Sequence, residues 1–237
     1  MTTLKENWKH FRDIVVQTAT FWKDSVQNQG IELSLRDASP RVRFSLLTGY
    51  EDDDARLCKA HLNSDDRVLE LGSSIGFIAL YCLKTLGIKD YAMVEANPAL
   101  LPVMEENFRL NEVAMPAYLN VAAGGEDGEA TFNVSHDYHA SSIHNIDNLD
   151  NAVTVAQRTI PSIISTLDFT PNVLIMDIEG AETVIPTDHL CLFDKVIVEF
   201  HRRFVGDQAI DSIIDAMEMC GLKQIAEDGY SSVFIRV

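Results

Sequence analysis

The feature that most constrains the fold is a short apolar segment that runs directly into a glycine-containing loop. Residues 68–76 read Val-Leu-Glu-Leu-Gly-Ser-Ser-Ile-Gly, and a helix-forming segment, 77–86, follows at once. This order of buried strand, glycine-containing loop and helix is the first half of a βαβ unit. In such a loop, glycine lets the backbone lie close to a ligand and to the following helix. The segment therefore predicts an α/β fold with a nucleotide-type cofactor at the loop.

An acid inside this loop restricts which cofactor it can bind. The spacing is Glu-x-Gly-x-x-x-Gly, from Glu70 through Gly72 to Gly76, and it differs from the Gly-x-Gly-x-x-Gly of dinucleotide-binding loops. Glu70 would repel a pyrophosphate, whereas it would attract the cationic α-amino group of S-adenosylmethionine, directly or through water. We expect the methionine carboxylate to face backbone N–H groups of the loop. The loop thus favours S-adenosylmethionine over a dinucleotide.

A second acid ends the next predicted strand. Residues 91–95 read Tyr-Ala-Met-Val-Glu, so Glu95 lies where a carboxylate can accept two hydrogen bonds from a ribose diol. Asn97 and Pro98 suit the start of a helix, which predicts a crossover helix over 99–110. A glycine turn or a strand-end acid alone is often only structural, but the two together at βαβ spacing favour a cofactor site.

Length and charge limit the classes of function. A chain of 237 residues suits one α/β domain with a modest addition. A net charge of −17 disfavours contact with nucleic acid or anionic lipid, so we expect a small-molecule substrate and neither nucleic acid nor a membrane as partner. No leader or membrane-length apolar run is evident, which predicts a cytoplasmic protein. Four cysteines without the spacing of a zinc or redox motif are expected to be reduced thiols, mostly buried: Cys58, Cys82, Cys191 and Cys220.

The N-terminal region predicts a helical extension. Aromatic and aliphatic residues recur at helical spacing and indicate an amphipathic helix over residues 3–29, ended by Gly30. Its apolar face either packs on the main domain or forms a substrate lid or a homodimer contact, and the sequence does not choose between them. We assign residues 1–49 to this extension, as part of the same globule, and residues 50–237 to the cofactor-binding domain.

The rest of the chain predicts a sheet that an antiparallel hairpin closes. Two strongly apolar strands each end in acids, and parallel strands would bring those ends to one edge of the sheet. An antiparallel last strand separates this plan from ordinary dehydrogenases. The predicted strands are 117–122, 130–134, 153–156, 173–177, 196–200, 222–226 and 230–237, and the predicted helices are 40–47, 52–62, 162–167 and 207–220.

Four motifs stand in order along the chain: Glu70-Leu71-Gly72-Ser73-Ser74-Ile75-Gly76, Val94-Glu95-Ala96-Asn97-Pro98, Met176-Asp177-Ile178-Glu179-Gly180-Ala181-Glu182 and Val198-Glu199-Phe200-His201. With these motifs the chain resembles the FkbM family of S-adenosylmethionine-dependent methyltransferases over about residues 50–201. Asp-x-Glu-Gly-Ala-Glu is the specific element. The family usually has lysine where this chain has Met176.

The resemblance implies a class I methyltransferase fold, Rossmann-like, and methylation of a hydroxyl on a sugar, polyketide or other secondary metabolite. It implies that Asn97 lies near the ribose, Ala122 near the adenine and Asp177 near the methionine end of the cofactor. The cofactor residues predicted in this way and from the loop are Glu70, Gly72, Ser73, Gly76, Glu95, Asn97, Ala122 and Asp177.

Methyl transfer to a hydroxyl needs a group that removes the hydroxyl proton. The imidazole of His201 has the reference pKa nearest neutrality, so we predict His201 as the base, oriented by a neighbouring acid. The structural alternative is that His201 caps a strand and that Glu182 faces solvent. The predicted catalytic residues are His201, Asp177 and Glu199, and the predicted substrate-binding residues are Ser142, Glu179 and Glu182.

The same residues also fit a metal site, N-methylation or a noncatalytic role. The same acids with His201 could bind magnesium or manganese, which suit carboxylates better than zinc does, but we predict catalysis without a metal. His136, His139 and His144 lie in the polar segment 135–152, where their spacing is weak evidence for a metal site. The alternatives to O-methylation are N-methylation, which could dispense with a strong base, and a noncatalytic module that binds the cofactor or a partner.

Overall fold

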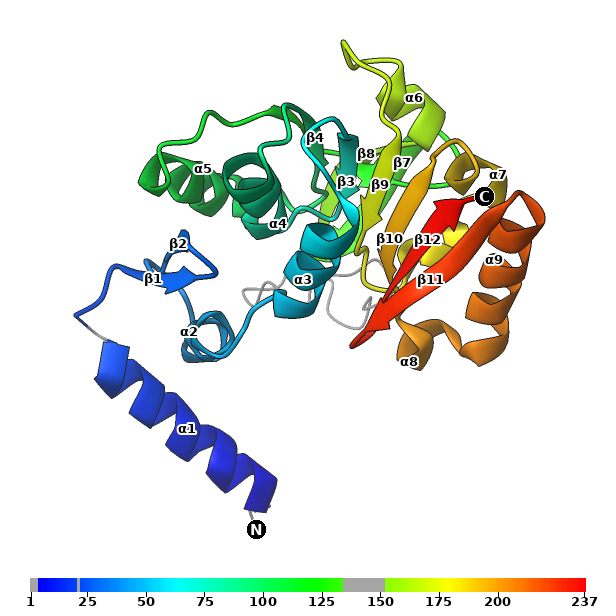
Figure 1. Cartoon of the computed structure of the whole chain (residues 1–237). Coiled ribbons are helices and arrows are strands. Elements are labelled where there is room, and N and C mark those ends of the chain that lie inside the picture. The colour runs from blue at the N-terminus through cyan, green and yellow to red at the C-terminus, as the bar shows by residue number, and fades with distance from the viewer. Residues whose placement is uncertain (1–3, 21, 134–151) are drawn as a thin grey trace.

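The computed structural model describes residues 4–20, 22–133 and 152–237. Its centre is a seven-stranded sheet with helices on both faces (Figure 1). None of the helices in these ranges is long and apolar enough to cross a membrane. In spatial order the strands are β11 (Leu222–Asp228), β12 (Ser231–Arg236), β10 (Lys195–Glu199), β9 (Val173–Met176), β3 (Arg67–Leu71), β4 (Asp90–Val94) and β5 (Ala117–Leu119).

The strand directions agree with the predicted sheet. β4 is parallel to β3 and β5, and β9 is parallel to β3 and β10. β12 is antiparallel to β10 and β11. The α/β, Rossmann-like sheet with an antiparallel closing strand is therefore confirmed. The chain runs from β3 to β4 on one side and later places β9 on the other side of β3. Such a reversal of strand order leaves a crevice for a ligand at the carboxyl ends.

Alternate residues of each strand build two cores. In β3, Val68 packs into one core and Leu69 into the other, and Val173 and Leu174 repeat this in β9. Both faces of the sheet are covered, which is why these strands are continuous apolar runs. The first core lies against α2 (Pro40–Leu47), α3 (Asp52–His61), α4 (Phe77–Tyr81) and α5 (Leu101–Leu110), and the second against α6 (Ile160–Ile164), α7 (Thr187–Leu190) and α9 (Asp207–Met219).

Capping residues start the helices that border the crevice. Ser39 accepts a hydrogen bond from the backbone N–H of Val42 at the start of α2. Asn97 does the same for Ala99 at the start of a 3₁₀ turn, η2 (Pro98–Leu100), which leads into α5. The predicted helix over 77–86 consists of α4 followed by a π-helical turn, η1 (Cys82–Leu86).

The prediction of one helix over residues 3–29 is wrong in its last third. α1 (Leu4–Thr20) ends early, and a hairpin of β1 (Ser25–Asn28) and β2 (Ile31–Ser34) follows. Gln29 and Gly30 both take left-handed backbone angles in the turn between these strands, which a helix cannot contain. Ile31 and Leu33, two residues apart on β2, both point into the first core. This strand-like spacing of apolar residues, and not the helical spacing, determines the structure here.

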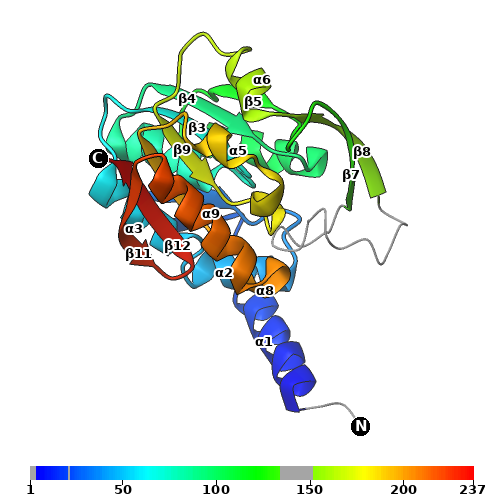
Figure 2. The same ribbon diagram turned by 90° about the vertical axis from the view of Figure 1, so that its right-hand side faces the viewer.

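The apolar face of α1 is only partly covered. α1 packs on α2 and extends away from the rest of the molecule (Figures 1 and 2). Val16 is buried, whereas Phe11, Ile14 and Val15 are 58%, 50% and 46% exposed. Packing on the main domain therefore accounts for only part of this face, and its use as a lid or homodimer contact stays a prediction.

A second, three-stranded sheet holds β6 (Ala122–Ala123), β8 (Ala152–Arg158) and β7 (Gly128–Asn133), in that spatial order. The predicted strand over 117–122 is divided between the two sheets, because β5 ends at Leu119 and Ala122 begins β6. The predicted substrate residue Ser142 lies outside the described residues, as do His136, His139 and His144.

A disulfide corrects the prediction of four reduced thiols. Cys191 and Cys220 form a bond with an S–S distance of 2.04 Å. They follow α7 and α9, two helices that pack together on the second core, so packing and not sequence spacing brings them together. Cys58 and Cys82 are free and buried, as predicted.

We expect the double variant Cys191→Ser/Cys220→Ser to lose about 3 to 4 kcal/mol of unfolding free energy, because the bond closes a loop of 29 residues in the unfolded chain. Urea unfolding measures this loss, and dithiothreitol should destabilise the wild-type protein equally while leaving the variant unchanged. Alkylation of the unreduced, unfolded wild-type chain should modify two thiols, and modification of four would contradict the disulfide.

Candidate active site

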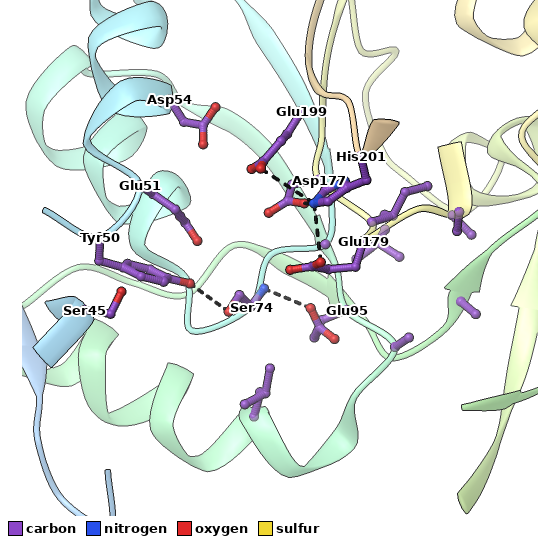
Figure 3. Close-up of a pocket in the computed structure, with 18 of the residues that line it drawn as sticks. Ser45, Tyr50, Glu51, Asp54, Ser74, Glu95, Asp177, Glu179, Glu199 and His201 are labelled. Carbon is purple, nitrogen blue, oxygen red and sulfur yellow. Dashed lines mark hydrogen bonds and ion pairs between the residues drawn. The ribbon is translucent and has the colours of Figure 1, made fainter. Parts of the chain in front are cut away.

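A cavity of about 410 Å³ opens where the strand order reverses (Figure 3). The α2–α3 connection, the loop after β3 and the residues after β4 form part of its wall. The loops after β9 and β10 complete it, together with Val121 and with Ala122 and Ala123 of strand β6 in the second sheet. Residues far apart in the sequence thus share one cavity, because parallel strands present their carboxyl ends at one edge.

Gly72 lets two of these loops touch. Its φ is +88°, and a Cβ atom there would lie 1.7 Å from the backbone carbonyl oxygen of Asp177. The backbone N–H groups of Gly72 and Ser73 donate to the carbonyl oxygen of Val94 at 2.9 and 3.1 Å. The loop after β3 is therefore fixed between the ends of β4 and β9, and no side chain fits at position 72.

Three predicted cofactor residues support the cavity from behind its wall. Ser73 is buried against Val94, and Asn97 is fully buried at the start of η2. Gly76 begins α4 with a φ of +80°, and a Cβ atom there would lie 2.9 Å from the ring of Phe108. These residues shape the loops, and their predicted contact with a cofactor stays a prediction.

Glu95 presents a fixed carboxylate to the cavity. One oxygen accepts a hydrogen bond from the backbone N–H of Ser74 at 2.9 Å, and the other accepts one from Asn97 at 2.7 Å. Burial raises the pKa of Glu95, and these backbone bonds partly offset the rise. Each carboxylate oxygen keeps further lone pairs that can accept hydrogen bonds from a diol.

Glu70 lies deeper than the sequence suggested. It is 3% exposed, accepts a hydrogen bond from the hydroxyl of Tyr91 at 3.0 Å, and lines a narrow second cavity together with Gly72 and Asp177. Burial raises the pKa of Glu70 to about 7, with smaller contributions from Glu95 and Asp54. A contact of Glu70 with a cofactor amino group stays a prediction.

Carboxylates converge on His201 at the opposite wall (Figure 3). The ring nitrogen Nε2 lies 3.3 Å from an oxygen of Glu179 and 3.6 Å from oxygens of Asp177 and Glu199. The other nitrogen, Nδ1, is hydrogen bonded to Glu182 at 2.8 Å. The structure thus brings the three predicted catalytic residues together and adds Glu179 to them.

The charges of this group perturb one another. Burial raises the pKa of Asp177, and Glu199 and Glu179 raise it further. Burial also raises the pKa of Glu179 and Glu199, while His201 lowers both. Burial lowers the pKa of His201, but the hydrogen bond and charge of Glu182, together with the charges of Glu179 and Glu199, more than offset this, so the pKa is raised. Without a further cation the surroundings favour the imidazolium, whereas the predicted base needs the neutral ring.

Of the other predicted residues, Ala122 and Glu179 line the cavity and Glu182 does not. Glu182 is fully buried behind His201, which corrects the alternative that it faces solvent. Its carboxylate also accepts a hydrogen bond from the backbone N–H of Gly180 at 3.1 Å. Glu182 therefore orients His201, and its predicted contact with a substrate stays a prediction.

Sequence reasoning missed the wall that the α2–α3 connection supplies. Tyr50, Glu51 and Asp54 line the cavity, and the hydroxyl of Tyr50 lies 2.9 Å from that of Ser74. Burial raises the pKa of Asp54 to about 6. No motif marks these residues. For Ser74, the position inside the glycine loop is the one sequence signal that could have indicated that it lines the cavity.

Comparisons with known proteins give structural similarity at low sequence identity. No protein-family model matches the chain, and no curated protein does. The predicted FkbM family is therefore not confirmed. The chain is similar to the crystal structure of methyltransferase FkbM from Methylobacillus flagellatus KT, with a TM-score of 0.48 and 14% identity over 74% of this chain and 44% of that one. It thus spans less than half the length of that structure.

Two further solved structures are similar over most of both chains. One is M. jannaschii TYW2 in complex with AdoMet, with a TM-score of 0.46, 13% identity and coverage of 90% of this chain and 86% of that one. The other is a methyltransferase from Pyrococcus furiosus, with a TM-score of 0.48, 12% identity and coverage of 97% and 98%.

Substitution of Gly72 by alanine should be far more damaging than the same change at Gly30. Both glycines have left-handed backbone angles, but a Cβ atom at position 30 has no neighbour within 4 Å. Gly30→Ala should cost about 1 to 2 kcal/mol of unfolding free energy for its backbone angle alone. Gly72→Ala adds a clash with the Asp177 carbonyl and should cost clearly more in the same urea titration. Equal losses would contradict the close approach of the two loops.

Glu70 should make stability fall as pH rises. The pKa of Glu70 is raised from 4.5 to about 7 in the folded protein, so the unfolded chain loses this proton first and is favoured increasingly between these values. Glu70→Gln should therefore stabilise the protein by up to about 3 kcal/mol at pH 8 and by less than about 1 kcal/mol at pH 5. Urea unfolding at both pH values measures this, with exposed Glu105→Gln as control. A pH-independent effect would contradict it.

Proposed function

We propose that this protein transfers the methyl group of S-adenosylmethionine to a hydroxyl group of a small metabolite. The observation that carries the proposal is the carboxylate of Glu95, fixed by two backbone N–H groups at the crevice where the strand order reverses. It faces the same cavity as Gly72 and the acids around His201. The Glu95 carboxylate can accept hydrogen bonds from the ribose diol, and the loop at Gly72 lets the cofactor approach the protein backbone closely. The acids around His201 attract the cationic methionine end.

The geometry supports one orientation of the cofactor. Its ribose would bind Glu95, and its adenine would lie toward Ala122, which lines the cavity on that side. The methionine end would lie toward Gly72 and Asp177, whose carboxylate attracts the α-amino group. In this orientation the sulfonium methyl group points to the acids around His201.

The reaction needs the acceptor oxygen in line with the bond between sulfur and the methyl carbon. A lone pair of that oxygen forms the new O–C bond, the electrons of the C–S bond stay on sulfur, and S-adenosylhomocysteine leaves. The hydroxyl proton passes to a basic group of the cavity. His201, Asp177 and Glu199 are the proposed groups, with Glu179 beside them at the acceptor.

Charge favours a neutral or cationic small acceptor. Seven carboxylates line the cavity, against two arginines and His201, so a nucleic acid or another polyanion would be repelled. The carboxylates are Glu51, Asp53, Asp54, Glu95, Asp177, Glu179 and Glu199.

The same acidic wall supports N-methylation as the second candidate, because it attracts a protonated amine. Labelled methyl transfer from S-adenosylmethionine to panels of hydroxyl and amine metabolites, followed by product analysis, separates the two. Cofactor binding without transfer to any acceptor would favour a noncatalytic module.

Isothermal calorimetry should show that S-adenosylhomocysteine binds to the wild-type protein and that NAD does not. Glu95→Ala should weaken S-adenosylhomocysteine binding by about 10- to 100-fold, since it removes one or two hydrogen bonds to a charged acceptor. Exposed Glu129→Ala is the matched control and should bind normally. Circular dichroism confirms that both variants fold. Binding of NAD without binding of S-adenosylhomocysteine would overturn the proposal.

A further inference from the structure

Oxygens of three carboxylates lie close to one ring nitrogen of His201, as donors around one bound metal ion do. Nε2 of His201 is 3.3 Å from Glu179, 3.6 Å from Asp177 and 3.6 Å from Glu199. Adjacent donors that bind one ion at about 2.1 Å lie about 3.0 Å apart in an octahedron and about 3.4 Å apart in a tetrahedron. The chosen donor atoms of Asp177, Glu179 and His201 all lie within 4.8 Å of one another. Only a small adjustment would let these three share an ion, whereas Glu199, which is not in this group, would have to move closer to join them.

His201 is positioned as a metal-binding histidine is. Its side chain is 5% exposed, and Nδ1 lies 2.8 Å from the fully buried Glu182. In the neutral ring that binds a metal, donation from Nδ1–H to this buried carboxylate would leave the lone pair on Nε2, which points into the cavity (Figure 3). Among the described residues, this is the only hydrogen bond of the ring. The ring also stacks on Phe204, with centroids 5.8 Å apart, and so has little freedom to turn away.

A carboxylate oxygen in the same place lacks a partner. Oδ1 of Asp177 is buried and has no hydrogen-bond partner in the part of the chain that the structure describes. It is the oxygen that lies 3.6 Å from Nε2 of His201. A buried carboxylate oxygen without a hydrogen bond is costly unless a cation or another donor binds it.

Backbone geometry brings the third carboxylate over the site. Asp177 and Glu199 lie at the carboxyl ends of the adjacent strands β9 and β10, which are paired in parallel. Glu179 has a φ of +50° and Gly180 a φ of +97°, so the chain reverses sharply after Asp177. This turn places the Glu179 carboxylate beside Nε2. A left-handed backbone angle at a glutamate is energetically unfavourable, and such unfavourable angles are common at functional sites.

The site lacks sufficient positive charge from the described chain. Arg203 reaches within 4.0 Å of Glu179, but its side chain is 71% exposed and lies over the ring of Phe204. No other lysine or arginine in the described ranges pairs with these three carboxylates. A divalent cation that displaced the proton from Nε2 of His201 would supply the positive charge that these three carboxylates lack.

We propose that Asp177, Glu179, Glu199 and His201 bind one divalent cation of the magnesium and manganese class, with Glu182 as a positioning residue for His201. Oxygen donors dominate the set, which suits these ions better than zinc. The proposal departs from the metal-free catalysis that the sequence predicted.

The role of the ion rests on the proposed function. It would bind the acceptor hydroxyl beside the cofactor methyl group and lower the pKa of that hydroxyl. With Nε2 bound to the ion, the hydroxyl proton would pass to the carboxylate of Asp177 or Glu199, the other two proposed acceptors, and not to His201. An acceptor with two adjacent oxygens, such as a vicinal diol, would bind such an ion best.

Manganese binding to the full chain tests the site directly. Electron paramagnetic resonance of free Mn²⁺ during a titration should show one bound ion per chain, with micromolar affinity. Asp177→Asn and His201→Ala should each weaken binding at least tenfold, and Glu182→Gln should weaken it about 10-fold or more through the orientation of His201. Glu199→Gln replaces either ligand variant that fails to fold, as judged by circular dichroism.

Asp53→Asn is the matched control. It removes the same charge from the same cavity wall but leaves all four donors in place, so affinity should change less than twofold. Absence of Mn²⁺ binding up to 1 mM, or equal weakening by Asp53→Asn and Asp177→Asn, would overturn the metal site. S-adenosylhomocysteine titration reports separately on the proposed function: cofactor binding without Mn²⁺ binding contradicts only the metal site, and the reverse contradicts only the function.

Discussion

The contact between Gly72 and the carbonyl oxygen of Asp177 is the constraint on which the site depends. A Cβ atom at position 72 would lie 1.7 Å from that oxygen, so only glycine allows the loop after β3 to meet the loop after β9. The same loop donates two hydrogen bonds to Val94 at the end of β4. Three strand ends are thereby held together, and the carboxylate of Glu95, the proposed ribose-binding group, comes to share one cavity with the acids around His201.

Concentrating acids in one cavity has an energetic cost that the surrounding fold must offset. Burial raises the pKa of Glu70 to about 7 and that of Asp54 to about 6, which shows that ionised forms are disfavoured in the folded protein. The two apolar cores, one on each face of the sheet, stabilise the folded protein against this cost. A site that destabilises the unliganded protein in this way is suited to cationic ligands, because their binding relieves the repulsion.

Sequence alone predicted the parts of the site that local pattern determines. The strand, loop and helix around Gly72 and the strand-end position of Glu95 follow from short-range periodicity and glycine chemistry. Glu182 could not be placed, because only the turn at Glu179 and Gly180 shows that it lies behind His201. Tyr50 and the Cys191–Cys220 bond depend on tertiary packing between distant elements. The turn at Gln29 was missed because a helical pattern across the N-terminal region masked a two-residue hairpin signal.

A crystal structure of the protein with S-adenosylhomocysteine would show whether this cavity is the methyl-transfer site. We expect the ribose hydroxyls within hydrogen-bond distance of Glu95 and the sulfur facing Asp177 and His201 across an open volume for the acceptor. Cofactor bound elsewhere on the molecule, or bound here with its sulfur directed away from His201, would contradict it.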